Sequence, residues 1–239
     1  MYTLVVLLAL GVASATYINE HRPDEGAEWS DVNHFFFGIA TKYGYPAEHR
    51  NVTTEDGYIL ALHRIPYGRM CRGKSKGPVI LMHGIALPGL SWIMSGTKKS
   101  LGFILADSCY DVWVPETRGV GQSDRHTHLH PDDPKYWDFS FHEKGLYDLK
   151  AIFDYILDET KASHLNYVGY DVGTTYLLVF LSLRPEYNKR VNGAYLLAPE
   201  AFQAPPKLPA FIFGSLSDLF LEKPHFDVVN LTRVIYHVF

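Results

Sequence analysis

A sharp turn between a strand and a helix is the clearest chemical signal in this sequence. Gly169 and Gly173 enclose Asp171, with a strand-like apolar run before them and a helix-like run after them. Two glycines let the backbones approach closely, and such a turn lifts its middle side chain above the sheet at a helix N-terminus. The middle residue is commonly a nucleophilic serine, so Asp171 places a carboxylate in a nucleophile position.

Backbone N–H groups beside this turn could stabilise an oxyanion. The sequence places Ile85 after His83-Gly84, at the end of an apolar run, and Val172 directly after the turn residue. These two N–H groups are the expected oxyanion donors. A carboxylate can also act as a covalent nucleophile, but that chemistry needs a histidine base to activate water. The simpler interpretation, which we prefer, is that Asp171 is a structural acid stabilised by the helix N-terminus.

The elements that position this turn alternate between strand and helix. The expected strands are 50–54, 58–64, 78–82, 110–114, 165–169 and 191–198. The expected helices are 97–107, a helix opened by the capping box Ser140–Glu143, and 174–184, which Pro185 ends. A short connection containing Gly57 joins the first two strands as a hairpin. This alternation predicts a mostly parallel sheet with right-handed crossovers and flanking helices.

At this level of detail the chain resembles the acid lipase family, the gastric and lysosomal type of α/β-hydrolase. The resemblance covers residues 32–199. Its matching segments are Tyr43-Gly44-Tyr45-Pro46, Val52-Thr53-Thr54-Glu55-Asp56-Gly57-Tyr58-Ile59-Leu60, Leu62-His63-Arg64-Ile65-Pro66, Met82-His83-Gly84, Leu105-Ala106-Asp107, Tyr110-Asp111-Val112-Trp113, Pro131-Asp132-Asp133-Pro134, Trp137-Asp138-Phe139-Ser140, Gly145-Leu146-Tyr147-Asp148-Leu149, Gly173-Thr174-Thr175 and Leu197-Ala198-Pro199. The resemblance implies the α/β-hydrolase fold and hydrolysis of triacylglycerols or sterol esters by a Ser-Asp-His triad beneath a helical cap.

The chain departs from the family pattern at the turn itself. The family turn reads Gly-His-Ser-Gln-Gly, so the residues at 170, 171 and 172 are all changed. The loop 115–123 is more similar to the R-G-x-G-x-S loop of general α/β-hydrolases. Triad order in this fold is nucleophile, acid, histidine, and the last two lie after later strands. We expect the chain to end before them, truncated at the start of the cap.

Few residues after the turn could complete a triad. His225 and His237 are the downstream histidines, and Asp218 and Asp227 are the candidate acids. We expect all four to be surface or cap residues, because we expect no further strand and loop that would hold a catalytic histidine. A triad is defined by the geometry of its side chains and not by their order in the chain. The expected organisation is a signal peptide at 1–15, the N-terminal part of an α/β-hydrolase domain at 16–199, and the beginning of the cap at 200–239.

Other chemistry is not indicated. The alternating His126, His128 and His130 could bind zinc, but no further ligand stands at suitable spacing, so we expect neither a metal nor a cofactor. Cys71 and Cys109 allow at most one bridge, and we expect free or buried thiols. A net charge of −4 indicates no nucleic-acid binder. A lipid or ester ligand and contact with a lipid surface are compatible with the resemblance, and a protein partner is not specified.

The N-terminus predicts export. An apolar run from Leu4 to Val12 precedes Ala13-Ser14-Ala15, which is typical of a signal peptide cleaved after Ala15. Sequons at Asn51 and Asn230 agree with glycosylation in the secretory pathway. We therefore expect a secreted or lysosomal protein.

Three hypotheses follow from the sequence. The first is a lipase relative that has lost catalysis, the second is a hydrolase with Asp171 as its nucleophile, and the third is an incomplete sequence of a longer protein. Continuation of the reading frame into an acid and a histidine would distinguish the third from the first.

Overall fold

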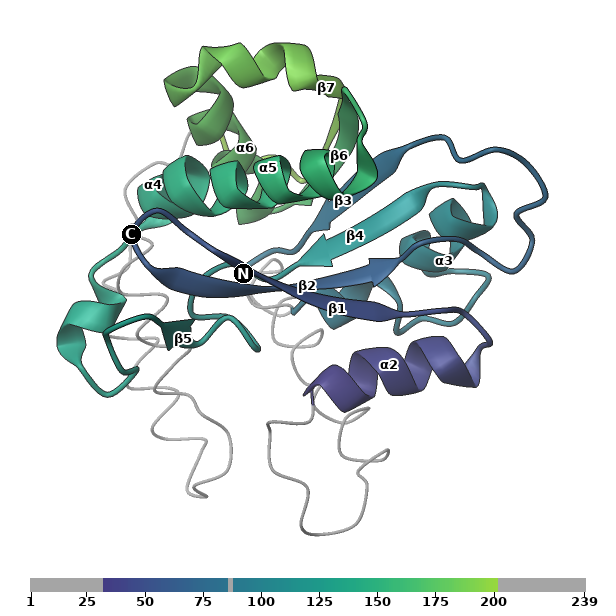
Figure 1. Ribbon diagram of the computed structural model, residues 1–239, viewed down its shortest axis with the longest axis horizontal. Coiled ribbons are helices and arrows are strands. Elements are labelled where there is room, and N and C mark those ends of the chain that lie inside the picture. Colours follow the sequence, from purple (N-terminus) through teal and green to yellow (C-terminus); the bar gives the residue numbers. More distant parts are fainter. Residues whose placement is uncertain (1–31, 86–87, 202–239) are drawn as a thin grey trace, which may run out of the picture. The chain divides into compact units, whose positions relative to one another are not determined.

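Helices flank both faces of a mixed seven-stranded sheet in the computed structural model, which describes residues 32–85 and 88–201 (Figure 1). The strand order is β1-β2-β4-β3-β6-β7, and β5 pairs with β2. The strands are β1 (Glu48–Thr53), β2 (Tyr58–Ile65), β3 (Pro78–Met82), β4 (Asp111–Pro115), β5 (Arg125–His126), β6 (Leu165–Tyr170) and β7 (Val191–Leu197).

The helices alternate with these strands, as the sequence predicts. The α-helices are α2 (Val32–Lys42), α3 (Leu101–Asp107), α4 (Phe141–Glu143), α5 (Leu149–Thr160) and α6 (Val172–Leu183). A π-helical segment, η4 (Lys144–Asp148), joins α4 to α5, and the 3₁₀ turns are η2 (Gly89–Trp92), η3 (Pro134–Trp137) and η5 (Pro185–Arg190). The predicted capping box is confirmed. The Ser140 side chain accepts a hydrogen bond from the backbone of the first turn, and the Glu143 side chain accepts one from the backbone N–H of Ser140.

Pairing in the sheet confirms the predicted hairpin and the parallel core. β1 and β2 are antiparallel, β2 is antiparallel to β4, and β3 is parallel to both β4 and β6. β7 is parallel to β6. The carboxyl ends of β3, β4 and β6 therefore meet at one edge of the sheet, where open α/β sheets place their functional loops.

Side chains of the buried strands contribute to two separate hydrophobic cores, one on each face of the sheet. On one face, α5 and α6 cover the sheet, and the core contains Leu60, Leu62, Ile80, Met82, Trp113, Leu149, Phe153, Ile156, Tyr167, Tyr176 and Phe180. On the other face, α2 and α3 supply Phe36, Ala40, Phe103 and Ala106 against Ile65, Val79, Leu81, Val112, Val114 and Val168. The period of two along each strand sends neighbouring residues to opposite cores. Both faces of the sheet are thus closed by helices.

Two helical predictions need correction. The helix expected from Thr97 begins at Leu101, because Gly96 has a φ of +80° and its carbonyl accepts bonds from the N–H groups of Lys99 and Ser100 in a turn. Helix α2 was not predicted at all. Its apolar residues pack on the face of the sheet opposite α5 and α6. In the described residues, no helix is long and apolar enough to cross a bilayer.

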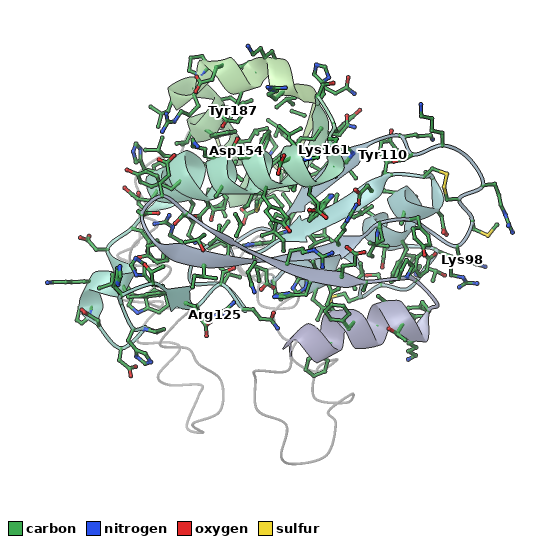
Figure 2. The ribbon with its side chains drawn as sticks, viewed as in Figure 1. Lys98, Tyr110, Arg125, Asp154, Lys161 and Tyr187 are labelled. Carbon is green, nitrogen blue, oxygen red and sulfur yellow. A yellow bond between two sulfur atoms is a disulfide. The ribbon has the colours of Figure 1, made fainter. Side chains whose placement is uncertain are left out.

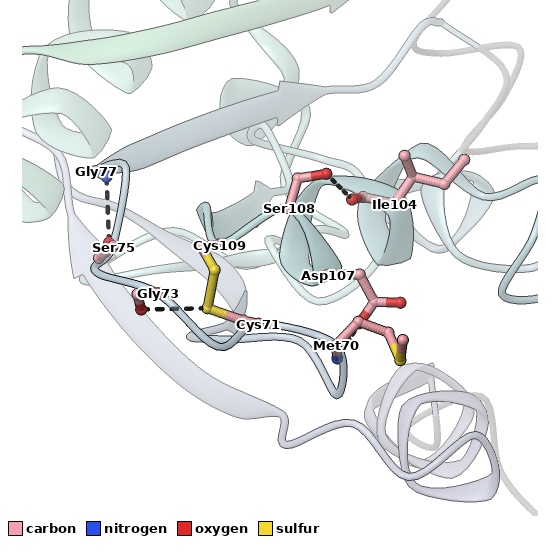
Figure 3. The surroundings of a disulfide bond; sticks show 9 residues. All are labelled: Met70, Cys71, Gly73, Ser75, Gly77, Ile104, Asp107, Ser108 and Cys109. Carbon is pink, nitrogen blue, oxygen red and sulfur yellow. Dashed lines mark hydrogen bonds between the residues drawn. A yellow bond between two sulfur atoms is a disulfide. The ribbon is translucent and has the colours of Figure 1, made fainter.

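The two cysteines form a disulfide, so the expectation of free or buried thiols is wrong (Figure 3). Cys71 lies in the loop that leads into β3, and Cys109 lies between α3 and β4. Their Cα atoms are 5.0 Å apart across a separation of 38 residues. Because β3 and β4 are paired neighbours, their preceding segments meet at the same edge, which the spacing of two cysteines in the sequence cannot reveal.

Most of the predicted leader and cap cannot be compared with the structure. The segment 1–15, and all of 200–239 except Glu200 and Ala201, lie outside the described residues. His225, His237, Asp218, Asp227 and Asn230 lie there as well. The signal peptide, the start of the cap and the domain boundaries remain predictions.

One buried ion-pair network joins the loop after β4 to the hairpin and to the long helix. The Arg118 side chain is fully buried and donates from Nε to Asp148 Oδ1 at 2.8 Å and from its terminal nitrogens to both Asp56 oxygens at 2.6 and 2.9 Å. The backbone N–H of Arg118 also donates to Asp148 Oδ2 at 3.0 Å. The guanidinium carbon lies 3.9 Å from the centroid of the Tyr58 ring. Every oxygen of the two carboxylates thus has a cationic or N–H partner.

We predict that Asp148→Asn lowers the free energy of unfolding by about 3–5 kcal/mol, because it leaves Arg118 buried with an incomplete set of anions. Urea unfolding followed by circular dichroism measures the loss. Asp158→Asn is the matched control, since its side chain is 84% exposed and its pair with Lys161 should contribute at most about 1 kcal/mol. Equal losses of unfolding free energy in the two variants would contradict a stabilising role for the buried pair of Arg118 and Asp148.

Candidate active site

The turn at Asp171 is a strained backbone position at the carboxyl edge of the sheet. Strand β6 ends at Tyr170 and α6 begins at Val172, and Asp171 between them has φ +56° and ψ −127°. Its N–H donates to the Leu197 carbonyl at 3.0 Å, and its own carbonyl accepts from the Thr174 N–H and hydroxyl at 3.0 and 2.6 Å. A non-glycine residue rarely adopts this conformation, so surrounding bonds must hold it. The side chain is half-buried.

The glycines on either side of the turn are explained by close backbone contacts. A Cβ atom on Gly169 would lie 3.0 Å from the carbonyl carbon and oxygen of Gly173. A Cβ atom on Gly173 would lie 2.7 Å from the His83 carbonyl oxygen. Neither contact could be relieved by a side-chain rotation, because both involve backbone atoms. The two positions therefore require glycine for the geometric reason that the sequence suggested.

The Asp171 carboxylate reaches across the site to the loop after β3. The Ile85 N–H donates to Asp171 Oδ2 at 3.0 Å. A Cβ atom on Gly84 would lie only 2.9 Å from the same oxygen, so this loop too must pass close to the turn. Val172 is the first residue of α6, and its N–H has no acceptor within the helix by geometry. The structure thus brings together Asp171, Ile85 and the helix N-terminus, and the Asp171 carboxylate accepts from the Ile85 N–H, which we predicted as an oxyanion donor.

His83 contacts the backbone on both sides of this loop through its two ring nitrogens. Its Nδ1 lies 2.8 Å from the Gly84 carbonyl oxygen, and its Nε2 accepts from the Thr117 N–H at 3.2 Å. The Gly84 carbonyl and the Ile85 N–H belong to one planar peptide and point in opposite directions. Holding the carbonyl therefore aims the N–H at Asp171. Burial lowers the pKa of His83 to about 4, so the ring is neutral, as its two bonds require.

Glu116 supports the same loop from a second point. Its carboxyl group is completely buried and accepts from the Gln122 N–H at 2.8 Å and from the Gly89 N–H. The other oxygen, Oε1, lies 4.0 Å from Nε2 of the buried His63 and has no hydrogen-bond partner among the described residues. Burial raises the pKa of Glu116 to about 7 and lowers that of His63 to about 3. The pair is therefore neutral in mildly acidic solution.

These supporting residues were not singled out from the sequence. Glu116 and Arg118 both stand in the loop 115–123, which we noted only for its glycines and its similarity to other hydrolases. A partial signal was present, because Glu116 and Arg118 closely follow the apolar run Val112-Trp113-Val114, and charged residues that become buried need partners. Their partners, however, are distant in the sequence and could not have been named.

The remaining candidates lie away from the turn. His126 is held by the Asp56 carbonyl and by the N–H groups of His128 and Leu129, whereas the His128 and His130 side chains are exposed. Within residues 32–85 and 88–201, no group of three or more His, Cys, Asp or Glu side chains could hold a metal ion. Asn51 is exposed on β1, and its side-chain oxygen accepts from Arg125 at 2.9 Å.

Comparison with known proteins gives consistent results. A family model described as "alpha/beta hydrolase fold" matches residues 77–225, and one described as "Partial alpha/beta-hydrolase lipase region" matches residues 37–96. Human gastric triacylglycerol lipase is 39% identical over 210 residues, which cover 82% of this chain and 52% of the relative. Human lipase member K is 43% identical over 163 residues, which cover 67% of this chain and 41% of the relative.

The solved structures agree on the fold. A proposed lipase of Acinetobacter baumannii AYE superposes with a TM-score of 0.52 at 12% identity, covering 87% of this chain and 58% of that one. At this identity the likeness concerns the fold alone, and with the family models it confirms the predicted α/β-hydrolase fold. The chain spans about half or less of the length of the curated relatives named above.

We predict that Glu116 stabilises the folded chain in acid and loses this effect towards neutral pH. Its pKa is higher folded (about 7) than unfolded (4.5), so the contribution is full below pH 4.5 and is lost as the pH rises through 7. The difference in unfolding free energy between the wild type and Glu116→Gln should fall by about 3 kcal/mol between pH 4.5 and pH 8.

Urea unfolding at pH 4.5, 6 and 8 measures this difference. Glu186→Gln is the control, because it makes the same chemical change at an exposed side chain. A pH-independent difference for Glu116→Gln would show that the buried carboxyl group titrates normally.

Proposed function

Because the chain belongs to the acid lipase family of α/β-hydrolases, we propose that it is a lipid-binding member that does not hydrolyse esters through a serine-type triad. The observation that carries the proposal is the hydrogen bond from the Ile85 N–H to Asp171 Oδ2 at 3.0 Å. This bond occupies the N–H that we propose as an oxyanion donor with the side chain that stands at the nucleophile position.

Two chemical reasons oppose triad catalysis at this site. A carboxylate has no hydroxyl proton to give to a histidine, so the Ser-His step has no equivalent. It also places negative charge where the tetrahedral intermediate develops its own, which opposes the stabilisation by the Ile85 and Val172 N–H groups. Loss of one triad member costs roughly 10⁴–10⁶ in rate. Neither reason depends on residues outside the described part of the chain.

Support within the site is structural. The imidazole that adjoins the loop is His83, and both of its nitrogens are engaged by backbone groups. It cannot serve as a general base without releasing the loop that it orients. We therefore propose that no residue of the described chain acts as a catalytic base at Asp171, and His225 and His237 are the residues to test if a base exists.

The ligand class is proposed from the relatives. Gastric triacylglycerol lipase is named for a triacylglycerol, and the family resemblance adds sterol esters. Both are neutral acyl lipids, so we propose an acyl lipid or ester as the ligand. No cofactor and no metal is proposed.

We also propose that the protein is secreted or lysosomal. The disulfide between Cys71 and Cys109 suits an oxidising compartment, and Asn51 is an exposed sequon on β1. The predicted signal peptide of residues 1–15, cleaved after Ala15, would direct the chain into the secretory pathway. Glycosylation at Asn51 and Asn230 is part of the same proposal.

A second candidate function is alkyl transfer to Asp171. It is favoured because the Ile85 N–H holds Oδ2, which leaves Oδ1 as the oxygen that would attack an electrophilic carbon such as that of an epoxide. The attack would form a C–O ester bond and break the carbon–oxygen bond of the ring, whose oxygen would take a proton from water. Hydrolysis of the resulting ester again requires a base, which places this function second.

We predict no turnover of p-nitrophenyl butyrate above buffer by the wild-type chain, and none by Asp171→Ser. The serine variant restores the hydroxyl but not a base, so a fluorophosphonate probe should label it no faster than the heat-denatured chain. A serine lipase serves as the positive control. Rapid labelling of Asp171→Ser would show that a base exists in the chain and would overturn this part of the proposal.

Intact-mass spectrometry tests the second candidate. After incubation with an epoxide, we predict no added mass on the wild-type chain beyond that on Asp171→Asn, which has the same shape without the nucleophilic charge. A stoichiometric adduct that maps to Asp171 and is absent from the asparagine variant would establish the aspartate as a nucleophile.

A further inference from the structure

The loop 66–77, which joins β2 to β3, carries a concentration of positive charge. It contains Arg69, Arg72, Lys74 and Lys76 and no acidic residue, in a chain whose net charge is −4. All four of these residues are exposed. The loop 66–77 is therefore strongly positive although the net charge of the chain is negative.

The loop is fixed to the body of the protein. Cys71 is bridged to Cys109 (Figure 3), and the Met70 N–H donates to Asp107 Oδ1 at 3.0 Å. The Lys76 N–H donates to the Cys109 carbonyl at 2.8 Å. A Cβ atom on Gly68 would lie 2.2 Å from the Asp107 backbone nitrogen, so the loop backbone packs directly on the end of α3. The charges are therefore presented in a defined arrangement.

Further cations gather beside the loop around Tyr43. The Arg69 guanidinium donates to the Tyr43 carbonyl at 2.7 Å, and Lys42 Nζ lies 5.9 Å from the centroid of the Tyr43 ring. A Cβ atom on Gly96 would lie 3.7 Å from the Tyr43 hydroxyl, which brings the turn with Lys98 and Lys99 to the same side chain. Figure 2 labels Lys98 at the same end of the molecule as the yellow disulfide.

We define the basic patch as the seven residues Lys42, Arg69, Arg72, Lys74, Lys76, Lys98 and Lys99. In the part of the chain that the structure describes, none of them forms an ion pair with a carboxylate. Elsewhere on the surface Arg50, Arg64 and Lys150 are paired. Lys135 and Lys189 form no ion pair among the described residues either, so the patch is distinguished by the number of cations that lie close together in the chain. Unpaired cations in such number form an electrostatic surface for an anionic partner.

Exposed apolar side chains stand within this positive surface. Met70 and Tyr67 are 68% and 59% exposed, the two highest values among the large apolar residues of the described chain. Both lie in the loop 66–77, next to Arg69. A nucleic acid or a sulfated polysaccharide offers little to an exposed methionine, whereas a lipid interface accepts the apolar tips and attracts the cations around them.

We propose that the basic patch, with Tyr67 and Met70, is a docking surface for membranes or lipid particles that contain anionic phospholipid. The cations would lie over the lipid phosphates while the two apolar side chains enter the interface. This inference goes beyond the proposed function, because it does not depend on Asp171.

The position of the patch in the sheet keeps it separate from the turn. The loop 66–77 leads into the amino end of β3, whereas Asp171 follows the carboxyl end of β6. Because β3 and β6 are parallel, the two features lie at opposite edges of the sheet. A molecule docked through the patch would present the Asp171 edge away from the lipid surface. Substitutions at Asp171 should therefore leave docking unchanged, so the two proposals can fail separately.

Co-sedimentation with vesicles tests the proposal. The 239-residue chain should bind vesicles of phosphatidylcholine with 30% phosphatidylserine, and should bind pure phosphatidylcholine vesicles at least tenfold more weakly. Binding should be lost in 1 M salt, where the Debye length falls to about 3 Å. Reversal of two charges by Arg72→Glu with Lys74→Glu should weaken binding at least about 25-fold.

Matched variants separate the patch from net charge. Lys135→Glu with Lys189→Glu makes the same change in net charge at exposed sites outside the patch and should bind like the wild type. Tyr67→Ser with Met70→Ser keeps every charge and should weaken vesicle binding at least fivefold, while leaving binding to heparin unchanged. Circular dichroism confirms that each variant is folded.

Three results would overturn the proposal. They are the absence of binding to the anionic vesicles at low salt, equal weakening by the two double charge reversals, and binding to heparin without binding to vesicles. The last would assign the patch to a soluble polyanion and not to lipid.

Discussion

Arg118 occupies a position on which both the sheet and the site depend. Its guanidinium is buried between Asp56, in the β1–β2 hairpin, and Asp148, at the end of the π-helical segment. A buried cation of this kind is tolerated only with its full set of anions, so the hairpin, the loop after β4 and the long helix must assemble together. Lys144, also buried, lies nearby and adds a second positive charge next to Asp148.

The loop that Arg118 holds in turn supports the site. Thr117 donates to His83, and Glu116 accepts from Gly89, so the loop 115–123 contacts the loop after β3 at two points. His83 then orients the peptide whose N–H meets Asp171. The support that would place an oxyanion donor is intact, although the residue it serves is a carboxylate. This combination of an ordered loop and a carboxylate at the turn is the basis of our proposal that the chain does not use serine-type triad chemistry.

The two ends of the parallel strands differ in how their charged groups are arranged. At the carboxyl ends of the parallel strands, the buried charges of Arg118 and Asp148 are paired with each other. In the loop 66–77, at the amino end of β3, the charged groups are exposed and form no ion pair within the described chain. Buried charges specify structure because leaving one unpaired is costly, whereas exposed charges of one sign act mainly on what approaches from solution.

The sequence by itself determined the order of the elements, the hairpin, the capping box at Ser140 and the turn around Asp171, because each depends on residues within a few positions of one another. Gly169 and Gly173 could be interpreted for the same reason. The tertiary structure alone decided the pairing of Cys71 with Cys109, the packing of α2, and the partners of Arg118 and Glu116. These contacts join residues that are far apart in the chain, and their energy depends on which strands become neighbours. It also decided that Asp171 faces the Ile85 N–H, since that bond spans 86 residues and exists only once β3 and β6 are paired.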